Sequence, residues 1–131
     1  MTKRIFLLAL LLGVTVATMA QRYVGGDISL LPSYEAKGAE YYDEAGAPID
    51  DPLAFFVSKG MNAMRLRLFV QPAHASAEDR GQGVCQDLDY IVPLAKRVKQ
   101  AGLRLLLDFH YSDSWADPAK QWTPRAWQGL D

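Results

Sequence analysis

Residues 103–109 read LRLLLDF, and this stretch decides the fold class. Apolar side chains fill nearly all of it, and polar residues, among them His110, follow at once. A strand this apolar is typically buried on both faces, as in a parallel sheet that helices cover. We therefore expect residues 103–109 to be a strand of a parallel β-sheet, buried on both faces.

Two further strands are predicted upstream of this one. Residues 23–29 form a short β-prone segment that ends in polar side chains, and residues 64–70 alternate in a strand-like pattern. The alternation places Arg65 and Arg67 on one face of the second strand and its aliphatic residues on the other. All three strands thus carry polar groups toward their carboxyl ends.

Two helices are predicted between the strands. The first, at residues 51–60, has an aspartate as its cap, a proline in its first turn and a glycine at its end. The second begins at Asp87 or Asp89 and ends at Ala101. We favour Asp89 as the cap, because Pro93 would then lie in the first turn, where its missing N–H matters little.

The order of these elements is strand, helix, strand, helix, strand, with residues 30–50 and 71–86 as loops and a possible helix start at residues 124–127. This alternation is typical of an α/β fold, either a (β/α)8 TIM barrel or a doubly wound sheet. No glycine-rich phosphate-binding motif follows the first strand, which argues against the second option. A complete barrel takes about 250 residues. We therefore expect the N-terminal part of a (β/α)8 barrel, with strands 1–3 and helices 1–2, truncated before strand 4.

The first twenty residues have the layout of a secretory signal. Lys3 and Arg4 precede an apolar run at residues 5–17, and small residues lead to Ala20. The run is shorter than the roughly 20 residues that span a bilayer, so no stable membrane span is expected after cleavage. We expect residues 1–20 to be a signal peptide, residues 21–131 an incomplete barrel, and the protein to be secreted to the periplasm, the cell surface or the medium.

The composition excludes several classes of function. The chain of 131 residues carries 14 basic and 15 acidic side chains, a balance that argues against a nucleic-acid binder. Its single cysteine, Cys85, excludes an internal disulfide framework and a thiolate zinc cluster. We expect Cys85 to be a half-buried or loop thiol without a functional role.

The polar residues at the carboxyl ends of the strands are the candidate site. Asp27, Arg65, Arg67, Asp108 and His110 would converge on one mouth of a barrel, where such groups hydrogen-bond the hydroxyls of a polyol. Alternatives stay open: Arg65 pairs with Asp27 or Asp108 inside the barrel, and His110 is a buried histidine with its hydrogen bonds satisfied. The tryptophans either pack or offer flat faces to sugar rings; they are Trp115, Trp122 and Trp127.

A metal site is a weaker alternative. Asp108 and His110 share one strand face, and His74 and Asp113 are further potential ligands. Two arginines in the same mouth would repel a metal ion, so we expect no metal and no other cofactor in this chain.

Four motifs in this order resemble glycoside hydrolase family 53: GDIS at residues 26–29, MRLRLFV at 64–70, LDY at 88–90 and DFHYSDSWADP at 108–118. The resemblance implies a (β/α)8 barrel and a secreted endo-β-1,4-galactanase whose partner is the polysaccharide type I arabinogalactan. Two residues depart from the family pattern. Phe69 stands where the family usually has tryptophan, and Pro93 lies where it usually has a helix-favouring residue.

The resemblance also implies roles for individual residues. Arg67, or Arg65, would lie near the catalytic carboxylates, and Asp27 would contribute a hydrogen bond. His110, Tyr111 and Asp113 would line the sugar-binding cleft. Trp115 would support the loop or touch the substrate.

The same resemblance implies a retaining mechanism with two glutamates at the ends of strands four and seven. The chain has four glutamates, Glu35, Glu40, Glu44 and Glu78, and all of them precede the third strand. We therefore expect both catalytic glutamates beyond Asp131, no catalytic residue among the 131 and no activity of the chain alone. Two other classes remain open, a non-catalytic sugar-binding module and a metal-dependent barrel hydrolase.

Overall fold

The computed structural model describes residues 22–130. Two predictions fall outside the described residues. One is the signal peptide at residues 1–20. The other is that both catalytic glutamates lie beyond Asp131. Within residues 22–130, no helix combines the length and the apolar character that crossing a membrane requires.

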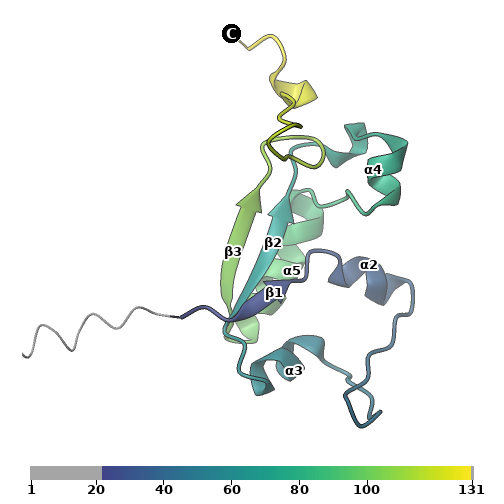
Figure 1. The fold of residues 1–131 in the computed structure, drawn as a ribbon, viewed down its shortest axis with the longest axis vertical. Helices are drawn as coiled ribbons and strands as arrows, with labels where there is room; N and C mark the ends of the chain where they lie inside the picture. Colours follow the sequence, from purple (N-terminus) through teal and green to yellow (C-terminus); the bar gives the residue numbers. More distant parts are fainter. Residues whose placement is uncertain (1–21, 131) are drawn as a thin grey trace, which may run out of the picture.

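A three-stranded parallel sheet with strand order β1-β2-β3 is the centre of the fold (Figure 1). It consists of β1 (Gly25–Asp27), β2 (Ala63–Leu68) and β3 (Arg104–Phe109). The register pairs Asp27 with Arg65 and Arg67 with Asp108. Because the strands are parallel and in this register, the polar residues near their carboxyl ends lie side by side, as predicted.

Two of the four α-helices in residues 22–130 are those predicted from the sequence. The first is α3 (Pro52–Ser58), in which the Asp51 carboxylate accepts hydrogen bonds from the backbone N–H groups of Leu53 and Ala54 at 2.9 and 3.1 Å. Gly60 follows the helix at φ +85°, a conformation that favours glycine. The predicted cap and stop of this helix are therefore confirmed.

The second predicted helix, α5 (Leu88–Gln100), begins two residues earlier than we favoured. The Asp87 carboxylate, and not that of Asp89, caps it by accepting a hydrogen bond from Tyr90 N–H at 2.9 Å. Pro93 thus lies inside the helix, where it donates no hydrogen bond. The Tyr90 hydroxyl also contacts Ser33 Oγ at 2.6 Å, so tertiary contacts fix this first turn despite the proline.

The stretches predicted as loops contain two short helices, which corrects the sequence interpretation. They are α2 (Leu31–Ala36), with a proline in its first turn, and α4 (Ala77–Gly81), whose N-terminus is capped by Ser76. Each is too short to show a helical period in the sequence. A single 3-10 turn, Pro72–His74, precedes α4, and another, Arg125–Trp127, stands where a third helix was expected.

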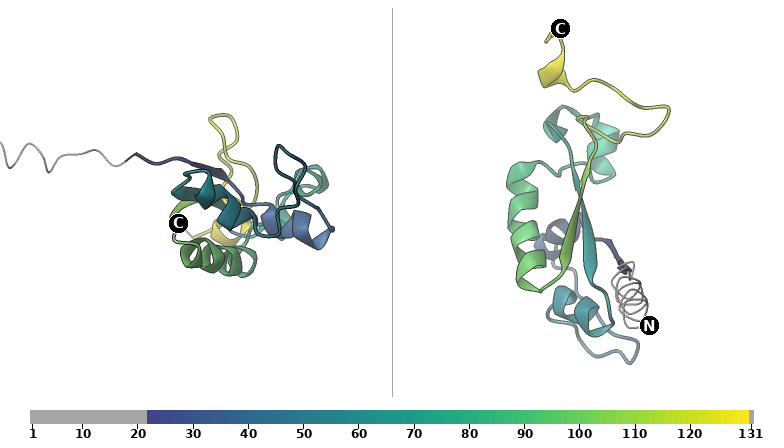
Figure 2. Two further views of the ribbon diagram at one scale, coloured as in Figure 1. Left: turned by 90° about the horizontal axis from the view of Figure 1, so that it is seen from below. Right: turned by 90° about the vertical axis from the view of Figure 1, so that its left-hand side faces the viewer.

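The main hydrophobic core lies between the sheet and α5. Met64 and Leu66 of β2 are buried against Ile91, Leu94 and Val98 of the helix. Figure 2 shows α5 running along one face of β2 and β3. The alternate residues of β2, the two arginines, therefore point to the opposite face.

The prediction that β3 is buried on both faces is wrong for the part of the chain that the structure describes. Leu106 is 59% exposed and Phe109 is 47% exposed. Leu106 pairs with Arg65 and therefore lies on the sheet face opposite α5, and β3 is also an edge strand, since β2 is its one partner among the described residues. Apolar side chains favour burial, but they are buried only where another part of the fold covers them.

Candidate functional site

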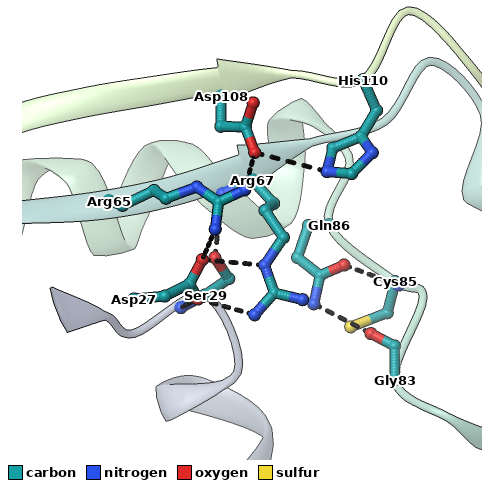
Figure 3. Close-up of polar contacts among 9 residues, drawn as sticks. All are labelled: Asp27, Ser29, Arg65, Arg67, Gly83, Cys85, Gln86, Asp108 and His110. Atoms are coloured by element: carbon teal, nitrogen blue, oxygen red, sulfur yellow. Dashed lines mark hydrogen bonds and ion pairs between the residues drawn. The ribbon is translucent and has the colours of Figure 1, made fainter. Parts of the chain in front are cut away.

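Four charged side chains from all three strands form one network, which we call the Asp–Arg cluster: Asp27, Arg65, Arg67 and Asp108 (Figure 3). Arg65 and Arg67 are two residues apart on β2, so both side chains point to the same face of the sheet. Asp27 ends β1 and Asp108 lies near the end of β3, one on each side of them.

Arg67 is the best-held member of the cluster. Its Nε and Nη2 donate to the two carboxylate oxygens of Asp27, both at 2.8 Å, in a fork that fits a carboxylate. The backbone N–H of Arg67 donates to Ser29 Oγ at 2.8 Å, and Ser29 is fully buried. Both ends of the residue are thus fixed by the segment that follows β1.

The environment of Asp27 keeps its carboxylate ionised. Burial by itself would raise the pKa of Asp27, but hydrogen bonds from Arg67 and from Ser29 outweigh burial and hold the pKa below its usual value. The Ser29 backbone N–H donates to Asp27 Oδ1 at 3.0 Å. The hydrogen bonds that Arg67 donates to Asp27 raise the pKa of Arg67, so the pair stays charged.

Arg65 bridges the two aspartates. Its Nη2 donates to Asp108 Oδ2, and its Nη1 lies 3.4 Å from Asp27 Oδ2. The Arg65 side chain is 44% exposed, so water screens these ion pairs and they contribute little stability. The interpretation that Arg65 pairs with Asp27 or Asp108 is therefore confirmed for both partners. Two positive and two negative side chains leave the cluster without net charge.

His110 lies beside Asp108 in its neutral form. Its Nδ1 accepts a hydrogen bond from the Ala116 backbone N–H at 3.1 Å, so the ring proton resides on Nε2. The Nε2 atom is buried 3.4 Å from Asp108 Oδ2 and has no hydrogen-bond partner among the described residues. The one ring N–H of His110 thus faces the Asp108 carboxylate and is buried away from solvent.

Burial lowers the pKa of His110, and the neighbouring arginines lower it further, against the opposing attraction of Asp108. An NMR titration of the full chain should therefore give His110 a midpoint below the ordinary value of about 6.5. Because the pKa is depressed in the folded state, the stability that neutral His110 contributes is present above pH 6.5 or so. It is lost as the pH falls through the folded pKa. A midpoint at or above the ordinary value would contradict this assignment.

Trp115 packs against the cluster. The Arg67 guanidinium lies over its ring at 5.0 Å from the centroid, and Phe69 meets it edge-on at 5.4 Å. Phe69 is itself buried and also contacts the His110 ring at 4.6 Å. Trp115 therefore positions Arg67, and Phe69 is a packing residue with no face open to a sugar.

Two of the predicted site residues make their contacts elsewhere. The carboxylate of Asp113 accepts the backbone N–H groups of Gln71 and Arg125, at 3.0 and 2.8 Å, and so joins the loops that follow β2 and β3. Tyr111 is exposed, and its ring stacks on Phe109 at 5.7 Å. Neither residue hydrogen-bonds or forms an ion pair with the Asp–Arg cluster.

The potential metal ligands do not gather. Within residues 22–130, no group of three or more His, Cys, Asp or Glu side chains is arranged to hold a metal ion. His74 lies 3.9 Å from Asp113, whereas His110 pairs with Asp108. These are two separate pairs, not one ligand set.

Sequence reasoning missed two buried polar residues that support the site. Ser29 fixes Arg67 and Asp27, as described above, and its position two residues after Asp27 was the available signal. Gln86 is fully buried, and its side chain bonds the Gly83 carbonyl at 2.9 Å and the Cys85 N–H at 3.1 Å. Its backbone carbonyl accepts the Phe69 N–H at 2.9 Å, which anchors the end of β2. Nothing in the local sequence marks Gln86 as buried.

Comparisons with known proteins give a consistent picture. The model of glycosyl hydrolase family 53 matches residues 23–131. The chain is 40% identical over 119 residues to a probable arabinogalactan endo-β-1,4-galactanase A of Neosartorya fischeri, a match covering 89% of this chain and 30% of that protein. It is 39% identical over 121 residues to the arabinogalactan endo-β-1,4-galactanase of Cellvibrio japonicus, covering 92% of this chain and 30% of that protein.

A solved structure agrees with these relatives. The GH53 catalytic domain of Ignisphaera aggregans superposes with a TM-score of 0.71 at 35% identity, over 88% of this chain and 32% of that chain. The chain therefore spans about 30% of the length of the proteins it matches. Its parallel sheet and helices are part of a (β/α)8 barrel, which confirms the predicted fold class.

Proposed function

Because the chain belongs to glycosyl hydrolase family 53, we propose that it forms part of a secreted endo-β-1,4-galactanase acting on type I arabinogalactan. The observation that carries this proposal is the family match over residues 23–131, together with about 40% identity to galactanases. Residues 1–20 would direct the secretion as a signal peptide.

The chemistry of the cluster suits an uncharged polyol. With His110 neutral, two arginines and two aspartates balance, so neither anions nor cations are favoured at this edge of the sheet. Guanidinium N–H groups donate to sugar hydroxyls, and carboxylate oxygens accept from them. The buried N–H of His110 lies 3.4 Å from Asp108 Oδ2 and helps to orient that carboxylate.

Each predicted site residue takes a role in this proposal. Arg65 and Asp108 are half-exposed and bind sugar hydroxyls directly, with His110 beside them. Asp27 and Trp115 position Arg67, which faces the reacting sugar. Tyr111 supplies an aromatic face, and Asp113 holds the loops of the cleft together.

Cleavage in this proposal follows a retaining mechanism. One carboxyl group protonates the leaving oxygen, and a second, about 5–5.5 Å away, forms the glycosyl-enzyme. The glutamates of the chain form other contacts or lie in elements away from the Asp–Arg cluster. Glu35 of α2 pairs with Arg97 at 2.7 Å, and Glu40 accepts from the Tyr42 hydroxyl at 2.6 Å. Glu44 lies in a turn and Glu78 in α4, so none of the four belongs to the Asp–Arg cluster. Both catalytic carboxylates would therefore come from a part of the enzyme beyond Asp131.

A chimera tests the proposal. In it, residues 23–131 replace the matching segment of the Cellvibrio japonicus galactanase; we refer to this protein as the galactanase chimera. We expect it to release reducing sugars from β-1,4-galactan, since the segment would complete the barrel and supply the Asp–Arg cluster. The full chain of 131 residues, assayed in parallel, should release none.

Two results would contradict the proposal. A folded chimera, with the circular dichroism of the parent enzyme, that cleaves no galactan would show that this segment does not serve a galactanase. Turnover of galactan by the full chain alone would show that the catalytic carboxylates lie within it.

A further inference from the structure

A cavity of about 580 Å³ opens beside His110, at the carboxyl end of β3. We call it the aromatic cavity, because Tyr111, Trp122 and Trp127 contribute rings to its lining. Polar side chains of the same loop also line it; they are Ser112, Asp117, Gln121 and Thr123. His110 borders both this cavity and the Asp–Arg cluster, so the two adjoin.

The rings in this cavity are left open to solvent. Trp122 is 66% exposed and belongs to neither hydrophobic cluster of the described residues. Trp127 is 40% exposed and contacts Tyr111, with 6.3 Å between ring centroids. Grouped exposed aromatic rings are unfavourable in water and commonly mark a binding surface. Packing of the described fold therefore does not account for them.

The backbone at Tyr111 holds its ring in this position. Its φ of +50° lies in the left-handed region, where a non-glycine residue is strained. Strain of this kind persists where the surroundings enforce it, often at ligand sites. Here it leaves the Tyr111 ring stacked on Phe109 and turned to the cavity.

The cavity wall is held at both ends by hydrogen bonds. At one end, Ala116 N–H donates to His110 Nδ1 at 3.1 Å. At the other, Arg125 N–H donates to Asp113 Oδ2 at 2.8 Å. Between them, Asp117 and Lys120 form a tight backbone bridge. A wall fixed in this way needs little ordering when a ligand binds.

We propose that the aromatic cavity is a binding subsite for a pyranose unit of a β-1,4-galactan chain, next to the unit that the Asp–Arg cluster would hold. The inference rests on the proposed function for its ligand class. In β-galactopyranose the axial hydroxyl at C4 leaves the hydrogens of C3, C4 and C5 together on one face. That apolar face packs on an indole ring, while Asp117 and Gln121 bond hydroxyls at the edge of the sugar.

Affinity electrophoresis of the full chain in native gels that contain β-1,4-galactan tests the inference directly. We expect galactan to retard the chain, and Trp122→Ala to weaken the apparent affinity by about tenfold, the scale of a lost aromatic contact. Trp122→Phe should keep most of the affinity. Tyr23→Ala is the matched control, because Tyr23 is similarly exposed but lies at the amino end of the sheet. It should bind like the parent chain.

Several outcomes would overturn the inference. They are a parent chain that galactan does not retard, a Trp122→Ala variant that binds like the parent, and a Tyr23→Ala variant that loses affinity equally. Equal retardation by the C4-epimeric β-1,4-glucan would overturn the assignment to galactan. The hydrolysis assay of the galactanase chimera reports separately on the proposed function. If the chimera is active and the Trp122→Ala variant of the full chain binds galactan like the parent, only this inference is refuted. If the chimera is inactive and the Trp122→Ala variant binds galactan more weakly than the parent, only the proposed function is refuted.

Discussion

Replacing Arg67 with lysine in the galactanase chimera should lower kcat/KM on β-1,4-galactan by about a hundredfold. The guanidinium of Arg67 makes two hydrogen bonds to the Asp27 carboxylate and lies over the Trp115 ring, 5.0 Å from its centroid. A lysine ammonium keeps the charge but loses the fork and the stacking plane, so both partners would shift. A displacement of about 1 Å near reacting groups is enough for a loss of this size.

The control for this variant is Arg104→Lys. Arg104 also lies over an aromatic ring, that of Tyr23, but at the amino end of β3 and away from the cluster. We expect it to leave kcat/KM unchanged. The melting temperature of both variants should be measured, so that a loss of activity is separated from a loss of fold. Arg67→Lys with parental kcat/KM would remove Arg67 from the proposed site.

Replacing Leu66 with alanine should lower the free energy of unfolding of the full chain by about 2–5 kcal/mol. Leu66 lies at the centre of β2, is fully buried and belongs to the same core cluster as Leu94 and Val98 of α5. Truncation removes buried apolar surface and leaves a cavity between the sheet and the helix, and both effects destabilise the fold. Urea denaturation followed by far-ultraviolet circular dichroism measures the change.

Leu88→Ala provides the comparison for that measurement. The same side chain is removed, but Leu88 is at the exposed start of α5, so the change should stay within about 0.5 kcal/mol. Equal effects of the two substitutions would mean that α5 does not cover β2 as described.

The order of strands and helices could be predicted because each is marked locally. Asp51 and Gly60 bracket α3, and the apolar residues of β2 and α5 follow the periods of a strand and a helix. The start of α5 was predicted incorrectly, because the helix is capped by Asp87 and not by Asp89. Pro93 argued for a later helix start, whereas the hydrogen bond between Tyr90 and Ser33, residues distant in the chain, accompanies the earlier one. The short helices α2 and α4 were missed because neither is long enough to show a period.

The candidate site was partly predictable for the same reason. Parallel strands place their carboxyl ends at one edge, so Asp27, Arg65 and Arg67 were expected to meet. The spacing along the chain does not fix how the charges pair, however, and Asp27 is shared between both arginines only because β1 and β2 are in this register. The place of Asp113 in a sugar-binding cleft stays a prediction, and the structure adds that its carboxylate joins two loops.

The sequence by itself determined the alternation of strands and helices, the apolar face of each, and the family to which the chain belongs. These properties depend on the intrinsic preferences of neighbouring residues and on motifs that are continuous along the chain. The tertiary structure decided which charges are paired, which strand surfaces are covered and which aromatic rings remain open. Those properties depend on contacts between residues far apart in sequence, whose distances are set only when the sheet and α5 pack together.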